Sequence, residues 1–61
     1  MLTYRAYLID RDDRVVDYKA VRAKTDREAL EKSRQYADGH DVEVWYLDRM
    51  VGRLVGDVRD G

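Results

Sequence analysis

Apolar and polar residues alternate along two stretches near the start of the chain. Residues 2–9 are rich in tyrosine, leucine and isoleucine, which suit a half-buried strand. Aspartates within residues 10–13 interrupt the pattern, and valines and a tyrosine restore it over residues 14–23. Because aspartate favours turns, we expect a β-hairpin around a polar loop of four residues.

A single helix is expected after this hairpin. Thr25 and Glu28 have the spacing of a capping box, in which Thr25 accepts a hydrogen bond from the N–H of Glu28 and Glu28 reaches back to the N–H of Thr25. Small and apolar residues then recur at helical spacing, and Gly39 supplies the left-handed residue that commonly ends a helix. The helix is therefore predicted to run to about Asp38.

A second hairpin is predicted over the last part of the chain. Alternation over residues 41–47 places the valines on one side of the strand and Trp45 and Leu47 on the other. A short Asp-Arg turn leads to a last strand over residues 50–55. With a two-residue loop, Trp45 would lie opposite Gly52 and cover its bare backbone.

These elements predict one α+β domain of ββαββ order, a four-stranded antiparallel sheet with one helix packed on one face. The strand order 2-1-3-4 keeps every neighbouring pair antiparallel. The domain is expected to span residues 1–57, with a polar C-terminal tail over residues 58–61. A chain of 61 residues without cysteine has a marginal core and no disulfide to support it.

One face of the predicted sheet has no cover, because one helix can cover only one face of four strands. The strands are apolar on both sides, and an exposed apolar patch usually marks an interaction surface. If the valine-rich face meets the helix, the opposite face is expected to join two copies in a homodimer, with another protein as a further possible partner. The expected interface residues are Tyr7, Trp45, Leu47, Met50 and Leu54.

Charge narrows the choice of partners. With 12 basic and 13 acidic residues the net charge is −1, so the chain lacks the basic surplus typical of nucleic-acid binding. No apolar run is long enough to cross a membrane, and no signal-peptide pattern is visible, which favours the cytoplasm. Tyr7, Tyr18 and Trp45 are nevertheless expected to share the open face with Arg5, a combination that can stack RNA bases, so a nucleic-acid-binding or antitoxin-like regulator is the alternative function.

The sequence predicts no enzyme, no cofactor and no metal site. The aspartates at 10, 12 and 13 resemble the start of a calcium loop, but Val15 and Val21 stand where that loop needs glycine and glutamate. His40 has no serine or cysteine nucleophile near it in the sequence and is interpreted as a histidine of a surface loop. A non-enzymatic interaction module is therefore the expected function.

Three segments, Tyr-Arg-Ala-Tyr at 4–7, Thr-Asp-Arg-Glu-Ala-Leu at 25–30 and Asp-Gly-His-Asp-Val-Glu-Val-Trp at 38–45, carry a resemblance. Together they resemble a family of short, functionally uncharacterised proteins of rhizobia and related alphaproteobacteria, over roughly residues 3–55. The resemblance implies a bacterial origin and the strand-strand-helix-strand-strand order, and it carries over no catalytic residue. Family members often have a glycine-containing turn where this chain has 46–48. The residues at 25 and 28–30 also resemble, more loosely, the helix start of small antitoxins.

Overall fold

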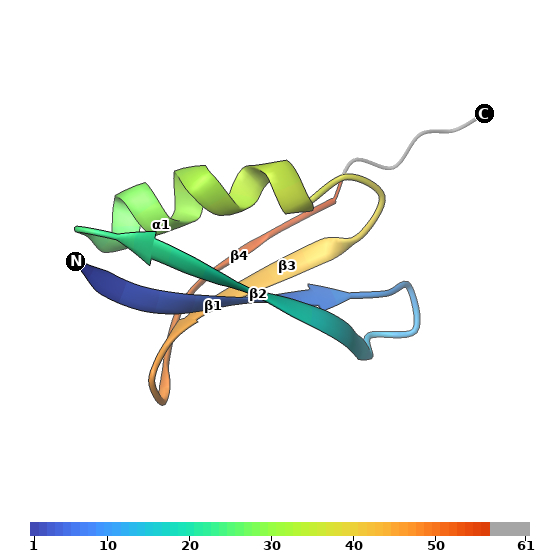
Figure 1. Ribbon diagram of the computed structural model, residues 1–61. Coiled ribbons are helices and arrows are strands. Elements are labelled where there is room, and N and C mark those ends of the chain that lie inside the picture. Colours follow the sequence, from blue (N-terminus) through green and yellow to red (C-terminus); the bar gives the residue numbers. More distant parts are fainter. Residues whose placement is uncertain (57–61) are drawn as a thin grey trace.

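Four strands, one α-helix and one short 3₁₀ helix make up the described part of the protein, residues 1–56 of a computed structural model. The expected boundary at residue 57 and the expected tail over 58–61 lie outside the described residues. The sheet is antiparallel with the order β2-β1-β3-β4, and the helix lies across one face (Figure 1). The predicted α+β architecture and strand order are thus confirmed. The elements are β1 (Leu2–Ile9), β2 (Val15–Ala23), α1 (Asp26–Ser33), the short 3₁₀ helix η1 (Arg34–Tyr36), β3 (Asp41–Tyr46) and β4 (Arg49–Leu54).

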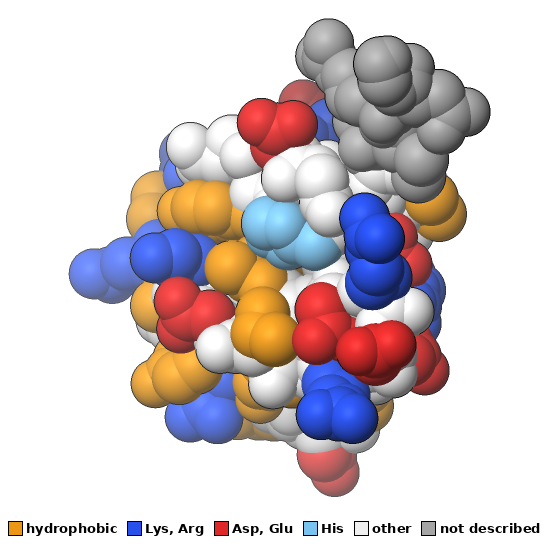
Figure 2. Space-filling view, turned by 90° about the vertical axis from the view of Figure 1, so that its right-hand side faces the viewer, with side chains coloured by type: hydrophobic (Ala, Val, Ile, Leu, Met, Phe, Trp, Pro, Cys, Tyr) orange, Lys and Arg blue, Asp and Glu red, His pale blue; other side chains and the backbone are white. Residues whose placement is uncertain are grey.

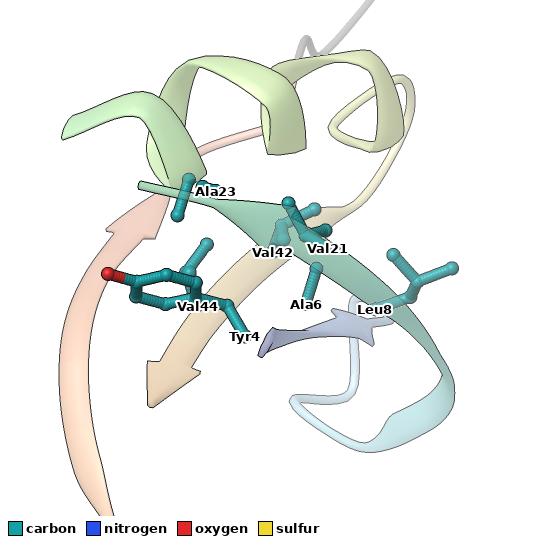
Figure 3. Packing of buried hydrophobic residues seen from close by; sticks show 8 residues of the cluster. Tyr4, Ala6, Leu8, Val21, Ala23, Val42 and Val44 are labelled. Atoms are coloured by element: carbon teal, nitrogen blue, oxygen red, sulfur yellow. The ribbon is translucent and has the colours of Figure 1, made fainter. Parts of the chain in front are cut away.

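The core lies between the sheet and α1. Alternate residues of the strands point to the helix (Figure 3). The helix contributes the small residue Ala29, which allows close packing. The absence of a side chain at Gly52 leaves room for Leu30, whose Cδ2 would lie only 3.1 Å from a Cβ placed there. The buried apolar cluster consists of Tyr4, Ala6, Leu8, Val21, Ala23, Ala29, Val42 and Val44.

The helix begins where the capping pattern predicts. Oγ1 of Thr25 accepts a hydrogen bond from the N–H of Glu28 at 3.1 Å. The Glu28 carboxylate accepts from the N–H of Lys24 at 2.8 Å, rather than from the expected N–H of Thr25. Its return contact therefore falls one residue earlier than in the predicted capping box, while the first turn is still held from both sides.

The helix ends earlier than predicted. α1 stops at Ser33 and continues only as η1, so the expected end at Asp38 is wrong. Oγ of the buried Ser33 donates a hydrogen bond to the carbonyl oxygen of Ala29 at 2.7 Å, a contact that competes with regular helix geometry. Gly39 does adopt the left-handed conformation, with φ of 87°, but within the loop that leads to β3.

The β3–β4 hairpin turns one residue earlier than expected. Its two central residues are Leu47 and Asp48, and Trp45 lies opposite Met50. The predicted pairing of Trp45 with Gly52 is therefore wrong, because Leu47 belongs to the turn and not, as expected, to the strand.

An irregularity in β4 changes which side chains face the helix. Val51 is an extra residue between the pairs Trp45–Met50 and Val44–Gly52. A β-bulge of this kind reverses the alternation of the residues beyond it. Leu54 consequently lies opposite Val42 and packs against the core instead of pointing to the open face.

The β1–β2 hairpin contains a comparable bulge. Ile9 pairs with Val15 and Leu8 with Asp17, so Val16 is the extra residue. In the loop, Oδ1 of Asp10 accepts hydrogen bonds from backbone N–H groups two and four residues later, at 2.9 and 3.0 Å. The predicted aspartate-rich hairpin loop is therefore confirmed.

Candidate functional site

The sheet face opposite α1 is not covered by any element of residues 1–56 (Figure 1). Strand alternation and cross-strand pairing bring aromatic, arginine and methionine side chains together on it. We call these residues the open-face cluster: Arg5, Tyr7, Tyr18, Trp45 and Met50.

Two tyrosines and an arginine form one part of the open-face cluster. Tyr7 of β1 and Tyr18 of β2 lie opposite each other, with ring centroids 6.1 Å apart. The guanidinium carbon of Arg5 lies 5.5 Å from the centroid of the Tyr18 ring, within the range of a cation–π contact. Tyr18 is 53% exposed, so this stacked arrangement faces solvent.

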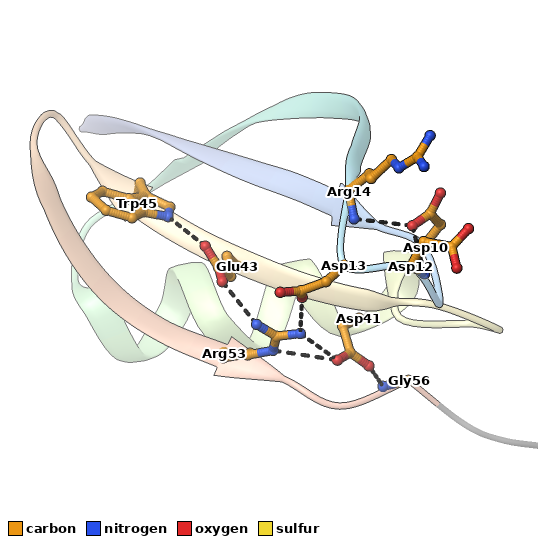
Figure 4. Close-up of polar contacts among 9 residues, drawn as sticks. All are labelled: Asp10, Asp12, Asp13, Arg14, Asp41, Glu43, Trp45, Arg53 and Gly56. Atoms are coloured by element: carbon orange, nitrogen blue, oxygen red, sulfur yellow. Dashed lines mark hydrogen bonds and ion pairs between the residues drawn. The ribbon is translucent and has the colours of Figure 1, made fainter.

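Trp45 forms the other part of the cluster. The half-buried indole donates a hydrogen bond from Nε1 to Oε1 of Glu43 at 3.2 Å, which orients the ring along the face (Figure 4). Met50, on the neighbouring strand, lies opposite Trp45 and is 42% exposed. Trp45, Met50 and Tyr7 therefore lie where the sequence placed them.

The other two residues expected at this surface lie elsewhere. Leu47 is 81% exposed at the tip of the β3–β4 turn, where its φ is 56°. Leu54 is half-buried against the core on the helix side, because the bulge at Val51 reverses the alternation of β4. Sequence alternation alone could not locate either residue, since the turn position and the bulge both shift the register.

An ion-pair network occupies the opposite end of the same face. Arg53 of β4 contacts Asp41 at 2.7 Å, Glu43 at 2.9 Å and Asp13 at 3.1 Å (Figure 4). The backbone N–H of Gly56 and the Arg53 guanidinium lower the pKa of Asp41, and the hydrogen bond to Asp41 raises the pKa of Arg53. Figure 2 shows acidic and basic side chains side by side at this end of the molecule. The network joins β3 and β4 to the β1–β2 loop.

A second network fixes the start of α1. The hydroxyl of the buried Tyr4 donates to Oδ1 of Asp26 at 2.7 Å, and Arg49 binds both carboxylate oxygens at 3.0 and 3.2 Å. Arg49, and then Tyr4, lower the pKa of Asp26, while burial raises the pKa of Tyr4. Sequence reasoning did not find this network. Its one signal was a tyrosine on the inward side of β1, because a buried hydroxyl needs a partner.

His40 lies half-buried in the loop before β3. Its Nε2 is buried without a hydrogen-bond partner among residues 1–56. The same part of the chain contains no group of three or more histidine, aspartate or glutamate side chains arranged to hold a metal ion.

Comparison of the chain with protein-family models, with curated proteins and with solved structures found no match. No helix within residues 1–56 combines the length and the apolar character needed to cross a membrane. The open-face cluster is the feature of the described chain that we take as the candidate functional site.

Proposed function

We propose that this chain is a non-enzymatic interaction module that acts as a homodimer in the cytoplasm. The open-face cluster carries the proposal. Tyrosine, tryptophan, arginine and methionine are the residue types enriched in protein interfaces, and the first three dominate binding hot spots. Here they lie together on one uncovered face, partly ordered by contacts among the tyrosines and Arg5 and by the hydrogen bond of Trp45 to Glu43.

The charged groups with shifted pKa values support a structural role. Asp26 and Asp41 are each paired with an arginine, and both carboxyl pKa values are lowered. A general acid or base works best with a pKa near the operating pH, whereas these carboxylates stay ionised at neutral pH. Their charges stabilise the fold, which fits a binding module.

The size of the core supports self-association. Tyr4, Val42 and Val44 are the largest fully buried apolar side chains, and most of β2 is exposed. Anything that binds the folded state and not the unfolded state stabilises the fold by mass action. A second copy of the chain would do so.

Sedimentation velocity of the wild-type protein from low micromolar to millimolar concentration tests the proposal. We expect the sedimentation coefficient to rise with concentration from the monomer value to the dimer value, together with a melting temperature that rises with concentration. A monomer at every concentration would overturn the proposed homodimer.

A second candidate function, binding of single-stranded RNA, is favoured by one observation. Arg5 stacks over Tyr18, and an arginine beside exposed aromatic rings is the arrangement on which bases stack. Titration with a short single-stranded RNA, followed by the fluorescence of Trp45, tests this candidate at low and high salt. Binding that weakens with salt and is lost in Tyr18→Ala, but not in the control Leu47→Ala, would support it. An unchanged signal at low salt would overturn it.

A further inference from the structure

β2 is the most exposed strand of the sheet. It forms one edge of the sheet (Figure 1). It has nine residues and is exposed at every position from Val15 to Ala20. Only Val21 and Ala23, near its end, are buried under α1. The other edge strand, β4, is shorter, with six residues, and its Arg53 is engaged in the ion-pair network. An exposed edge offers unpaired N–H and C=O groups to which another strand can bind.

One hydrogen bond shows which residues of β2 direct their backbone N–H and C=O groups outward from the edge of the sheet. The N–H of Tyr18 donates to Oδ1 of the preceding residue, Asp17, at 2.8 Å. In an antiparallel ladder, alternate residues direct N–H and C=O to the neighbouring strand and the others direct them outward. A side chain of its own strand occupies the Tyr18 donor, so we assign Tyr18 to the outward set, and Ala20 with it by alternation.

We propose that two copies of the chain pair antiparallel along β2, with the two-fold axis at Tyr18, to form one continuous sheet. This inference rests on the homodimer proposed above and names the surface that joins the copies. In this register Tyr18 exchanges backbone hydrogen bonds with Tyr18 of the second copy. Asp17 then lies opposite Lys19 of the second copy, and symmetry repeats that pair.

The charges of β2 select this register. Opposite charges directly across a strand pair are stabilising and like charges are destabilising. A two-fold axis at Asp17 would place two aspartates opposite each other, and an axis at Lys19 would place two lysines opposite each other. The axis at Tyr18 avoids both, and it pairs Asp17 with the oppositely charged Lys19 of the second copy.

Pairing also gives Asp17 a new partner. In the free chain its carboxylate accepts the Tyr18 N–H. In the dimer the Tyr18 carbonyl of the second copy accepts this N–H, which releases the carboxylate to bind Lys19 of the second copy. Asp17 and Lys19 are two residues apart, so both lie on the same side of the strand.

Edge pairing uses the Tyr18 part of the open-face cluster and joins the open faces of the two copies into one continuous surface, whereas face-to-face stacking would cover them. Arg53 and its carboxylate partners lie on that face, and stacking two copies would remove these charges from water. Edge pairing leaves them solvated and places the two Tyr18 side chains next to each other. A ladder of this length forms a small interface. The surface that it buries is below the roughly 1,200 Å² that separates weak complexes from stable ones. The dimer is therefore expected to depend on concentration.

Charge reversal on β2 tests the proposal. Asp17→Lys and Lys19→Asp each create two like-charge pairs in the homodimer, and each should raise its dissociation constant about tenfold or more in sedimentation velocity. An equimolar mixture of the two variants restores opposite charges across the ladder and should dimerise as the wild type does. Asp48→Lys, which makes the same charge change in the β3–β4 turn, is the matched control and should leave the dimer unchanged.

The outcomes separate this inference from the proposed function. A wild-type chain that stays monomeric overturns both. A wild-type dimer that survives both charge reversals overturns the β2 interface and leaves the homodimer in place. Loss of the dimer in both variants without recovery in their mixture overturns the register. Circular dichroism of each variant confirms that the compared chains are folded.

Discussion

Replacing Leu47 by glycine is expected to stabilise the protein. Leu47 is the first central residue of the two-residue β3–β4 turn and has a φ of 56°. The φ of Asp48, the second central residue, is not positive. A positive φ at the first central position alone is the pattern of a type II′ turn, which favours glycine there. Leucine at this position bears backbone strain.

The expected gain follows from two opposing terms. The left-handed region costs an L-residue about 1–2 kcal/mol, and glycine removes this cost. Glycine also gains conformational freedom in the unfolded chain, which offsets about 0.5–1 kcal/mol. Few contacts are lost, because Leu47 is 81% exposed. The difference of the two terms is centred on about 0.75 kcal/mol, which corresponds to a rise in melting temperature of about 3–6 °C for a domain of this size.

Thermal unfolding followed by circular dichroism measures this effect, with Leu47→Ala as the matched control. Leu47→Ala removes the side-chain atoms beyond Cβ but keeps Cβ and with it the backbone strain. The melting temperature of this variant should therefore stay close to that of the wild type. Melting at two protein concentrations separates the turn from any role of Leu47 between copies, because only a dimer contact makes the difference depend on concentration. If Leu47→Gly melts no higher than Leu47→Ala, the strain argument is wrong.

Three further substitutions test other contacts. Thr25→Ala removes the helix cap and should lower the free energy of unfolding by about 1 kcal/mol in urea denaturation, whereas Thr25→Ser should retain most of it. Gly56→Ala should be more destabilising than Gly39→Ala, because a Cβ at residue 56 would overlap the backbone of His40, whereas a Cβ at residue 39 meets open space and bears only the strain of a positive φ; equal melting temperatures would contradict this. The pKa of Asp26 is lowered in the folded state, so its contribution to stability is present above the unfolded pKa of about 3.9 and is lost as the pH falls through the folded value. Asp26→Asn should therefore flatten the loss of stability below about pH 4, and an unchanged slope would show that this carboxylate is not responsible.

Periodicity and helix capping were sufficient to predict the architecture. Alternation identified the strands, the Thr25–Glu28 spacing located the start of α1, and the requirement for antiparallel neighbours led to the observed strand order. These features depend on residue types close together in sequence. The helical spacing did not indicate the early end of α1 at Ser33, whose buried hydroxyl donates back to the carbonyl of Ala29.

The candidate site could be predicted only in part, because it depends on register. Tyr7, Trp45 and Met50 lie on the open face as expected. Leu54 does not, since the bulge at Val51 inserts one residue into β4, and no residue type in β4 predicts this bulge. The networks around Arg53 and Asp26 escaped prediction for the same reason: their partners come from different strands and meet only once the register is known.

The central ladder of the sheet bears on how the chain folds. Each hairpin closes over a short loop, but β1 and β3 come from opposite halves of the chain, and the Asp13–Arg53 contact joins residues 40 positions apart. Closing a long segment costs more entropy than closing a short one, and folding slows as contacts become less local. We therefore expect the two hairpins to form early and the docking of β1 against β3 to limit the folding rate. Salt screens the exposed Asp13–Arg53 pair, so high ionic strength weakens this tie between the first loop and the last strand.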